Sequence, residues 1–227
     1  MTAIAATPTA DHPITAHAAA THAWMARCGI AAVTVFAAVA LAQAASRPGF
    51  DIMRHPVSLL SAGALGWIQQ LNFAVSGALM LVCAVGARRA LAGARGRTWV
   101  PILLGIQGIG FVAASMFSLD PSDGFPAGTP LGRPTAMSTH DMLHMAAASP
   151  AFVAMIAACF VLARRCSFDG LRRWAIAGHT SGAIFLAGLV WCNSGANGGP
   201  LGLFAGAIVA WAYLAATVNR YASHRIA

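Results

Sequence analysis

Six long apolar stretches separated by short polar segments dominate the chain. They lie at about residues 24–44, 67–88, 99–118, 139–163, 174–193 and 200–220. Each is close to the roughly 20 residues that a helix needs to cross the hydrocarbon of a bilayer. In hydrocarbon every backbone N–H and C=O needs a partner, and a helix supplies it within the segment. A transmembrane β-barrel would alternate apolar and polar residues, and these stretches do not.

This pattern predicts an all-α fold: a polytopic transmembrane bundle of six helices. We expect a disordered cytoplasmic tail at 1–22, a six-helix transmembrane domain at 23–221 and a short cytoplasmic tail at 222–227. Two small-residue repeats favour close helix contacts, and they are Gly178 with Gly182 and Gly202 with Gly206. Pro150 removes a backbone donor from the fourth helix, where we expect a bend.

The composition supports a membrane protein. Of 227 residues, 58% are hydrophobic and only 9% are charged, whereas a soluble domain carries about 25% charged residues. Disorder would require low hydrophobicity and high net charge, so it is excluded for the chain as a whole. All basic residues are Arg and all acidic residues are Asp. With the abundant Ala, this usage is typical of a GC-rich bacterial genome.

The arginines predict the orientation of the bundle. Eleven fall on one side of the six stretches: Arg27, Arg88, Arg89, Arg95, Arg97, Arg164, Arg165, Arg172, Arg173, Arg220 and Arg225. Three fall on the other: Arg47, Arg54 and Arg133. Basic loops stay in the cytoplasm, so both termini are predicted to be cytoplasmic and the longer loops to be outside. Topology therefore accounts for the net charge of +8, and no nucleic-acid partner is expected.

The two longer outer loops carry most of the chemistry. The first contains His55 and Ser58, and the second contains Asp120 and Asp123. Ser138 followed by Asp141 resembles a capping box, which predicts that the fourth helix begins there. His140 and His144 then lie one turn apart on the same helical face.

Three interpretations of these outer residues remain open. His140 and His144 have the spacing of two ligands of one metal ion, and a third ligand would come from His55, Asp120 or Asp123. Alternatively, ion pairs and hydrogen bonds join the same residues into a structural polar cluster. In the third interpretation they relay a proton or bind a ligand, through His55, Asp120, Asp123 and His144. No cofactor is indicated beyond a possible zinc ion.

Two further polar residues lie deep within the apolar stretches. They are Gln107 and His179, and polar residues inside a membrane are functional candidates by default. His179 lies near the cytoplasmic end and His140 and His144 near the outer end, so they cannot share one ion. For His179 we favour a hydrogen bond to a neighbouring helix.

Several short motifs, in this order between six spans, resemble a bacterial and archaeal membrane family known as domain of unknown function 998. The first group of motifs is His55-Pro56-Val-Ser58-Leu, Gly66-Trp67, Asn72-Phe73 and Gly77. The second is Phe117-Ser-Leu-Asp120-Pro121, Gly124-Phe125-Pro126-Ala-Gly128 and His144. The resemblance covers about residues 30 to 215. It implies the six-span fold and directs attention to the outer loops, but it implies no substrate.

A second resemblance concerns chemistry alone. Alkaline ceramidase-like membrane hydrolases hold a zinc ion with three His, two of them in an HxxxH on one helix, beside a Ser and an Asp. This chain offers a comparable set: His55, Ser58, Asp120, His140 and His144. In that interpretation Asp120 is the candidate general base beside a zinc-activated water. Those enzymes have seven spans, however, and their Ser precedes its His.

The sequence therefore leaves three functions open. The first is a non-enzymatic protein of the bacterial cytoplasmic membrane that binds a lipid, a small solute or a partner membrane subunit through its outer polar cluster. The second is a zinc-dependent hydrolase acting on a lipid amide or ester. The third is a small-solute or proton-coupled transporter, although carriers usually show inverted repeats and broken helices. The incomplete catalytic set favours the first.

Overall fold

Six α-helices and one short 3-10 helix make up the computed structural model, which describes residues 13–93, 95–132 and 134–223. Their bounds are α1 Pro13–Ser46, η1 Val57–Ser61, α2 Gly66–Ala90, α3 Trp99–Ala114, α4 Thr139–Phe168, α5 Arg172–Asn193 and α6 Gly199–Ser223. For residues 13–22 only the backbone is described. The predicted all-α fold is confirmed.

The first helix begins earlier than the sequence predicted. We expected a disordered tail to residue 22, but α1 starts at Pro13. Proline is favoured at the first helical position, and the Ala-rich segment that follows has high helix propensity. The rest of the two predicted tails, 1–12 and 224–227, lies outside the described residues.

Five of the six helices are long and apolar enough to cross a membrane, and α3 is shorter. The five spans are Ala23–Ser46 within α1, and α2, α4, α5 and α6. The apolar helix α3 has 16 residues and ends at Ala114, four residues before the predicted end of its stretch. The apolar residues beyond Ala114 form a turn and an irregular segment that lead into the loop.

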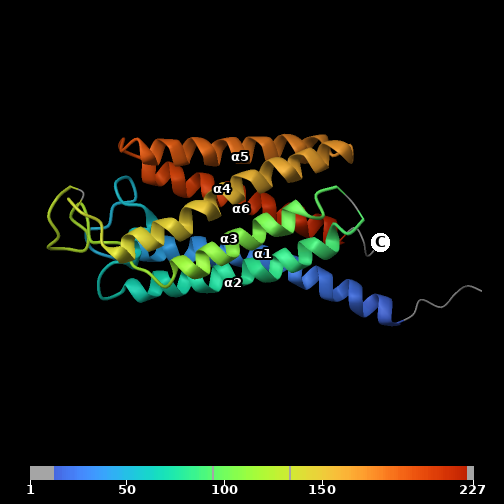
Figure 1. Cartoon of the computed structure of the whole chain (residues 1–227), viewed down its shortest axis with the longest axis horizontal. Coiled ribbons are helices and arrows are strands. Elements are labelled where there is room, and N and C mark those ends of the chain that lie inside the picture. The colour runs from blue at the N-terminus through green and yellow to red at the C-terminus, as the bar shows by residue number, and fades with distance from the viewer. Residues whose placement is uncertain (1–12, 94, 133, 224–227) are drawn as a thin grey trace, which may run out of the picture.

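The helices lie side by side along the longest axis of the molecule (Figure 1). Each helix packs against the next one in the chain, and α6 packs back against α1. The interior is held by aromatic rings from different helices. Phe36 of α1 contacts Phe73 of α2 at 5.5 Å between ring centroids, Phe111 of α3 at 5.6 Å and Trp211 of α6 at 5.4 Å. Rings at these separations stabilise the core beyond their buried area.

Glycines allow the closest helix approaches. A Cβ atom on Gly77 of α2 would lie 2.7 Å from the carbonyl oxygen of Gly108 in α3. On Gly206 of α6 it would lie 2.9 Å from the Cα of Phe185 in α5. The predicted repeats are therefore real contact positions, because Gly178, Gly182 and Gly202 also face neighbouring side chains.

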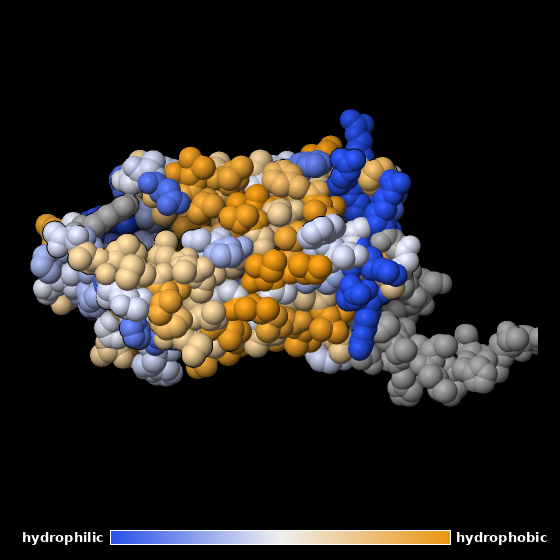
Figure 2. Space-filling model, in the orientation of Figure 1, coloured by the Kyte–Doolittle hydropathy of each residue, from blue (hydrophilic) through white to orange (hydrophobic). Residues whose placement is uncertain are grey.

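The two ends of the bundle differ in charge. One end, here the arginine end, carries the arginines in the last turns of α2, α4 and α6 and the first turn of α5. Figure 2 shows these hydrophilic residues gathered at one end, beside an apolar band over the helices. The start of α1 and the end of α6 also lie at this end (Figure 1). The opposite end, here the loop end, consists of residues 47–65, 115–132, 134–138 and 194–198.

Candidate functional site

The first loop is fixed to the bundle by Arg47. This side chain is only 9% exposed, and it donates hydrogen bonds to the carbonyl oxygens of Leu60 and Ala62, the latter at 2.7 Å. Its guanidinium also lies 4.6 Å from the centroid of the Phe125 ring in the second loop. Burial lowers the pKa of Arg47 below its ordinary value. Arg47 is therefore a structural cation rather than a free ligand group.

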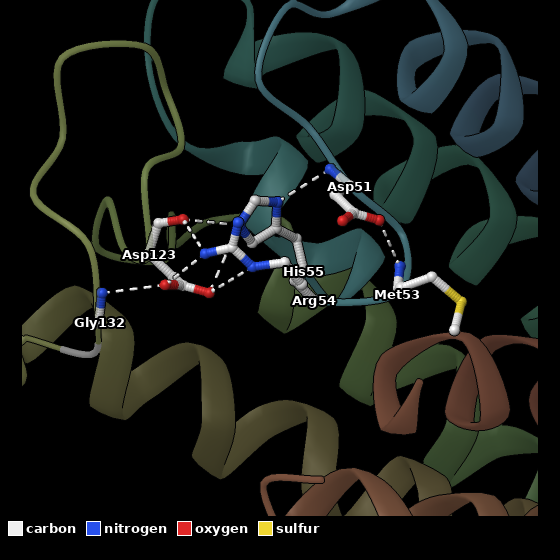
Figure 3. A network of polar contacts seen from close by, with 6 residues as sticks. All are labelled: Asp51, Met53, Arg54, His55, Asp123 and Gly132. Carbon is white, nitrogen blue, oxygen red and sulfur yellow. Dashed lines mark hydrogen bonds and ion pairs between the residues drawn. The ribbon is translucent and has the colours of Figure 1, made fainter. Parts of the chain in front are cut away.

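His55 joins the two loops, and both of its ring nitrogens are occupied (Figure 3). The backbone N–H of Asp51 donates to His55 Nδ1 at 3.0 Å. Nδ1 must then be the bare acceptor, so Nε2 carries the proton and donates to the carbonyl oxygen of Asp123 at 3.0 Å. The ring is 1% exposed and packs against Phe50 and Phe125.

Asp123 is the centre of the contacts in Figure 3. Its Oδ1 lies 2.7 Å from Arg54 Nη2 and its Oδ2 lies 3.2 Å from Arg54 Nε, which is the two-point geometry of a strong ion pair. Oδ1 also accepts from the backbone N–H of Gly132 at 2.9 Å. The Gly132 N–H and Arg54 lower the pKa of Asp123 below its usual range.

The start of α4 is capped by two residues of the second loop, Ser138 and Asp120. Ser138 is the N-cap, and its Oγ accepts from the backbone N–H of Asp141 at 3.2 Å, as predicted. The backbone N–H of Ser138 donates to Asp120 Oδ2 at 2.7 Å. Asp120 thus takes the part that a capping-box carboxylate usually takes within its own helix.

The two histidines of α4 have different surroundings. His144 is 1% exposed, and its Nδ1 lies 3.0 Å from the carbonyl oxygen of Ala114, the last residue of α3, and 3.0 Å from that of Phe117, just beyond the helix. A carbonyl only accepts, so Nδ1 carries the proton and Nε2 is a bare acceptor. Nε2 is buried without a hydrogen-bond partner in the described chain. His140 is exposed and stacks edge-on against Phe117.

A cleft of about 840 Å³ opens between these loops. Its walls come from both loops, the first turns of α4 and the α5–α6 connection. The polar lining residues are Arg54, His55, Asp120, Ser122, Asp123, Asp141, Asn193 and Asn197, and the apolar ones include Met53, Leu119, Met137 and Met145. The volume falls within the range of small-molecule sites. Such sites also combine apolar walls with a few polar groups, as this cleft does.

A small apolar pocket of about 30 Å³ lies in the bundle interior, next to the cleft. It shares Pro56 and Pro200 with the cleft. Its other walls are mostly rings and aliphatic side chains: Phe36, Val57, Phe73, Phe111, Phe152, Leu203, Phe204, Ala207 and Trp211. Ser58, a catalytic candidate from the sequence, lines this apolar pocket, whereas Asp120 lines the cleft.

The predicted metal ligands do not come together as a metal centre in the structure. Among residues 13–93, 95–132 and 134–223, no group of three or more His, Cys, Asp or Glu could hold a metal ion. The proposed ligands His55, His140 and His144 do not form such a group. His55 has both nitrogens bonded within the loops, so it has no free lone pair for a metal ion. His144 keeps a bare Nε2, but no group of three ligands forms around it in the described chain. These residues do not fit a zinc ion.

The chain belongs to the family described as "Protein of unknown function (DUF998)", whose model matches residues 30–218. This confirms the resemblance noted from the sequence motifs. The family and the apolar helices together define a multi-pass membrane protein. No curated protein and no solved structure matches the chain.

Sequence reasoning overlooked several buried polar residues. Gln43, Gln69, Asn72 and Ser76 are at most 5% exposed, although only Gln107 was noted as a deep polar residue on these helices. The sequence could have revealed them, because all four are polar residues that lie at the edge of an apolar stretch or within one. His179 differs from expectation: it is exposed and lies against the Phe160 ring, 5.8 Å between centroids, rather than hydrogen-bonded to a neighbouring helix.

Proposed function

We propose that the protein binds a small amphipathic molecule, with a hydrogen-bonding head and an apolar end, in the cleft at the loop end. The observation that carries this proposal is the cleft of about 840 Å³, whose wall combines charged groups with the apolar side chains of Met53, Leu119, Met137 and Met145. A membrane lipid is one source of such chemistry and an amphipathic solute is another. Of the four ligand-binding residues predicted from the sequence, His55, Asp120 and Asp123 line the cleft and His144 does not.

The charges of the cleft favour a head that donates hydrogen bonds. Arg54 and His55 already donate to Asp123. The carboxylates of Asp120 and Asp141 each have more acceptor sites than one backbone donor fills. His144 lies behind this wall as a positioning group, because it holds the segment before Asp120 by the carbonyl of Phe117.

We further propose that the loop end faces the outside of a bacterial cytoplasmic membrane. The arginine excess at the opposite end supports this orientation, with both termini in the cytoplasm. The path of the chain supports α3 as a sixth span. Because α2 ends at the arginine end and α4 begins at the loop end, α3 must connect the two ends of the bundle. The cleft then opens to the outer aqueous phase, and its apolar pocket lies at the level of the outer leaflet.

The test is native mass spectrometry of the protein released from nanodiscs of phosphatidylethanolamine and phosphatidylglycerol. Ala196→Trp places a large side chain in the cleft wall, and Ala127→Trp places the same side chain on an exposed loop position outside the cleft. We expect one retained adduct in the wild type and in Ala127→Trp, and its loss in Ala196→Trp. The adduct mass distinguishes a lipid from a solute. An adduct that Ala196→Trp leaves unchanged would overturn the proposal.

A further inference from the structure

A row of neutral polar side chains runs through the bundle, apart from the cleft. We call it the amide seam, and it consists of Gln43, Gln69, Asn72, Ser76 and Gln107. All five side chains are at most 5% exposed. Four come from the last turns of α1 and from one face of α2 at positions i, i+3 and i+7. Gln107 comes from the middle of α3, at the level where Gly108 of α3 approaches Gly77 of α2, the residue after Ser76.

Hydrogen bonds fix how the amides of the seam point. Asn72 Nδ2 donates to the carbonyl oxygen of Phe36 at 3.1 Å, and a carbonyl can only accept. The same nitrogen donates to Gln69 Oε1 at 3.3 Å, and Gln43 Nε2 donates to that oxygen at 2.8 Å. Ser76 Oγ donates to Asn72 Oδ1 at 3.4 Å. One carbonyl therefore determines the orientation of three amides in succession.

Four polar atoms of the seam have no hydrogen-bond partner in the described chain. They are Gln43 Oε1, Gln69 Nε2, Gln107 Nε2 and Gln107 Oε1. Buried polar atoms in folded proteins are almost always hydrogen-bonded to the chain or to ordered water. Two of these atoms are donors and two are acceptors. A cation would need acceptors alone and an anion donors alone, so the seam suits a small neutral species that both donates and accepts.

We infer that the amide seam binds a short file of ordered water molecules inside the bundle. Water is the smallest species with the required donors and acceptors, and internal waters typically bond two to four polar groups. The file begins at the loop end, where Gln43 and Gln69 lie in the terminal turns of α1 and α2, and stops near Gln107. Beyond it the buried faces of these helices are apolar, with Met80, Cys83 and Leu104.

The inferred water molecules therefore lie only in the half of the bundle nearer the loop end. It contains amides and one hydroxyl and no group that titrates near neutral pH, so it orients water without storing a proton. This site is separate from the proposed cleft, since none of its five side chains lines that cleft. Its test does not depend on any ligand of the cleft.

Hydroxyl-radical labelling by X-ray radiolysis tests the inference, because it oxidises side chains next to water even where bulk solvent is excluded. Ser76→Cys introduces a reactive sulfur in the seam of the full-length protein. The native Cys83, two turns further along α2 and 0% exposed like Ser76, is the matched control. We expect the introduced sulfur to be oxidised several-fold faster than Cys83, with ¹⁸O incorporated from labelled water. Equal oxidation of the two sulfurs would overturn the proposal.

A stability measurement gives an independent test, because a hydrated seam and a dry seam predict opposite changes in the melting temperature. Gln107→Leu removes two of the four unpartnered atoms. If these atoms bond water, the change leaves water without a partner, and the melting temperature falls by roughly 2–4 °C, which is about one lost hydrogen bond. If they are dry, their removal raises it. The control is Gln70→Leu, at the half-exposed position of α2 that follows Gln69. It should change the melting temperature less. No change or a rise for Gln107→Leu would contradict the inference.

Discussion

Arg54 and Asp123, 69 residues apart in the chain, form a two-point ion pair that fastens the two long loops to each other. The pair is partly exposed, and such pairs contribute little on their own. Here Asp123 also accepts from Gly132 and, through its backbone carbonyl, from His55. The wall of the cleft therefore depends on one carboxylate and its neighbours.

This arrangement predicts a pH dependence. The Gly132 N–H and Arg54 lower the pKa of Asp123 in the folded protein below its value in the unfolded chain, about 3.9. The stability that the carboxylate contributes is therefore complete above about pH 4 and lost as the pH falls through the lowered pKa. We expect Asp123→Asn to lower the melting temperature at pH 7 and the difference from wild type to shrink below pH 4. A difference independent of pH would contradict this account.

His55 should be a structural residue of the loop end. His55→Ala removes an acceptor for the Asp51 N–H and a donor to the Asp123 carbonyl, and both lie in a buried setting. We expect the free energy of unfolding to fall by about 1–3 kcal/mol, measured by denaturation in detergent. His140→Ala, at an exposed position, is the control and should change it by about 0.5 kcal/mol or less. Equal effects of the two changes would refute this role for His55.

Metal analysis separates the structural interpretation from the zinc interpretation. Because His55 has both nitrogens bonded and the described residues contain no group of three metal-ligating side chains, we expect zinc at background level in the purified protein. A chelator should leave the melting temperature unchanged. Stoichiometric zinc that is lost in both His140→Ala and His144→Ala would show that the loops rearrange around a metal.

Two glycines provide a matched test of helix packing. A Cβ on Gly77 would lie 2.7 Å from the Gly108 carbonyl oxygen, whereas a Cβ on Gly105 meets no atom within 4 Å. Gly77→Ala should therefore destabilise the protein by about 1–3 kcal/mol through overpacking. Gly105→Ala should be neutral or stabilising by up to about 1 kcal/mol. Thermal unfolding of both variants measures the contrast, and equal stabilities would show that α2 and α3 are further apart.

The proposed orientation is tested with reporter fusions. Alkaline phosphatase is active only outside the cytoplasm, so a fusion near Gly128 should be active and one near Arg95 inactive. The arginine distribution is the physical reason, because basic loops are retained in the cytoplasm. The reverse pattern would place the cleft and its residues on the cytoplasmic side.

The sequence predicted the helices and the cap at Ser138 because both depend on residues close together in the chain. Apolar stretches of membrane length and a Ser followed by Asp three residues later are local signals. The Arg54–Asp123 pair is not local. It depends on a loop conformation in which Asp123 has φ of 51°, in the left-handed region, and no pattern of neighbouring residues specifies which charged residue it meets. Likewise α3 ends where His144 of another helix meets its carbonyl groups, within an apolar stretch that continues.

The short helix α3 has a consequence for the membrane itself. Its 16 residues rise by about 24 Å, whereas the hydrocarbon of a typical bilayer is about 30 Å thick. In the proposed topology Trp99, which is 63% exposed, places one end of α3 at the membrane interface. The shortfall therefore falls at the other end, where Met116 is 68% exposed. With α3 as the proposed sixth span, the bilayer beside it must thin to match its length, so the proposal places a local depression of the leaflet next to the loops that form the cleft.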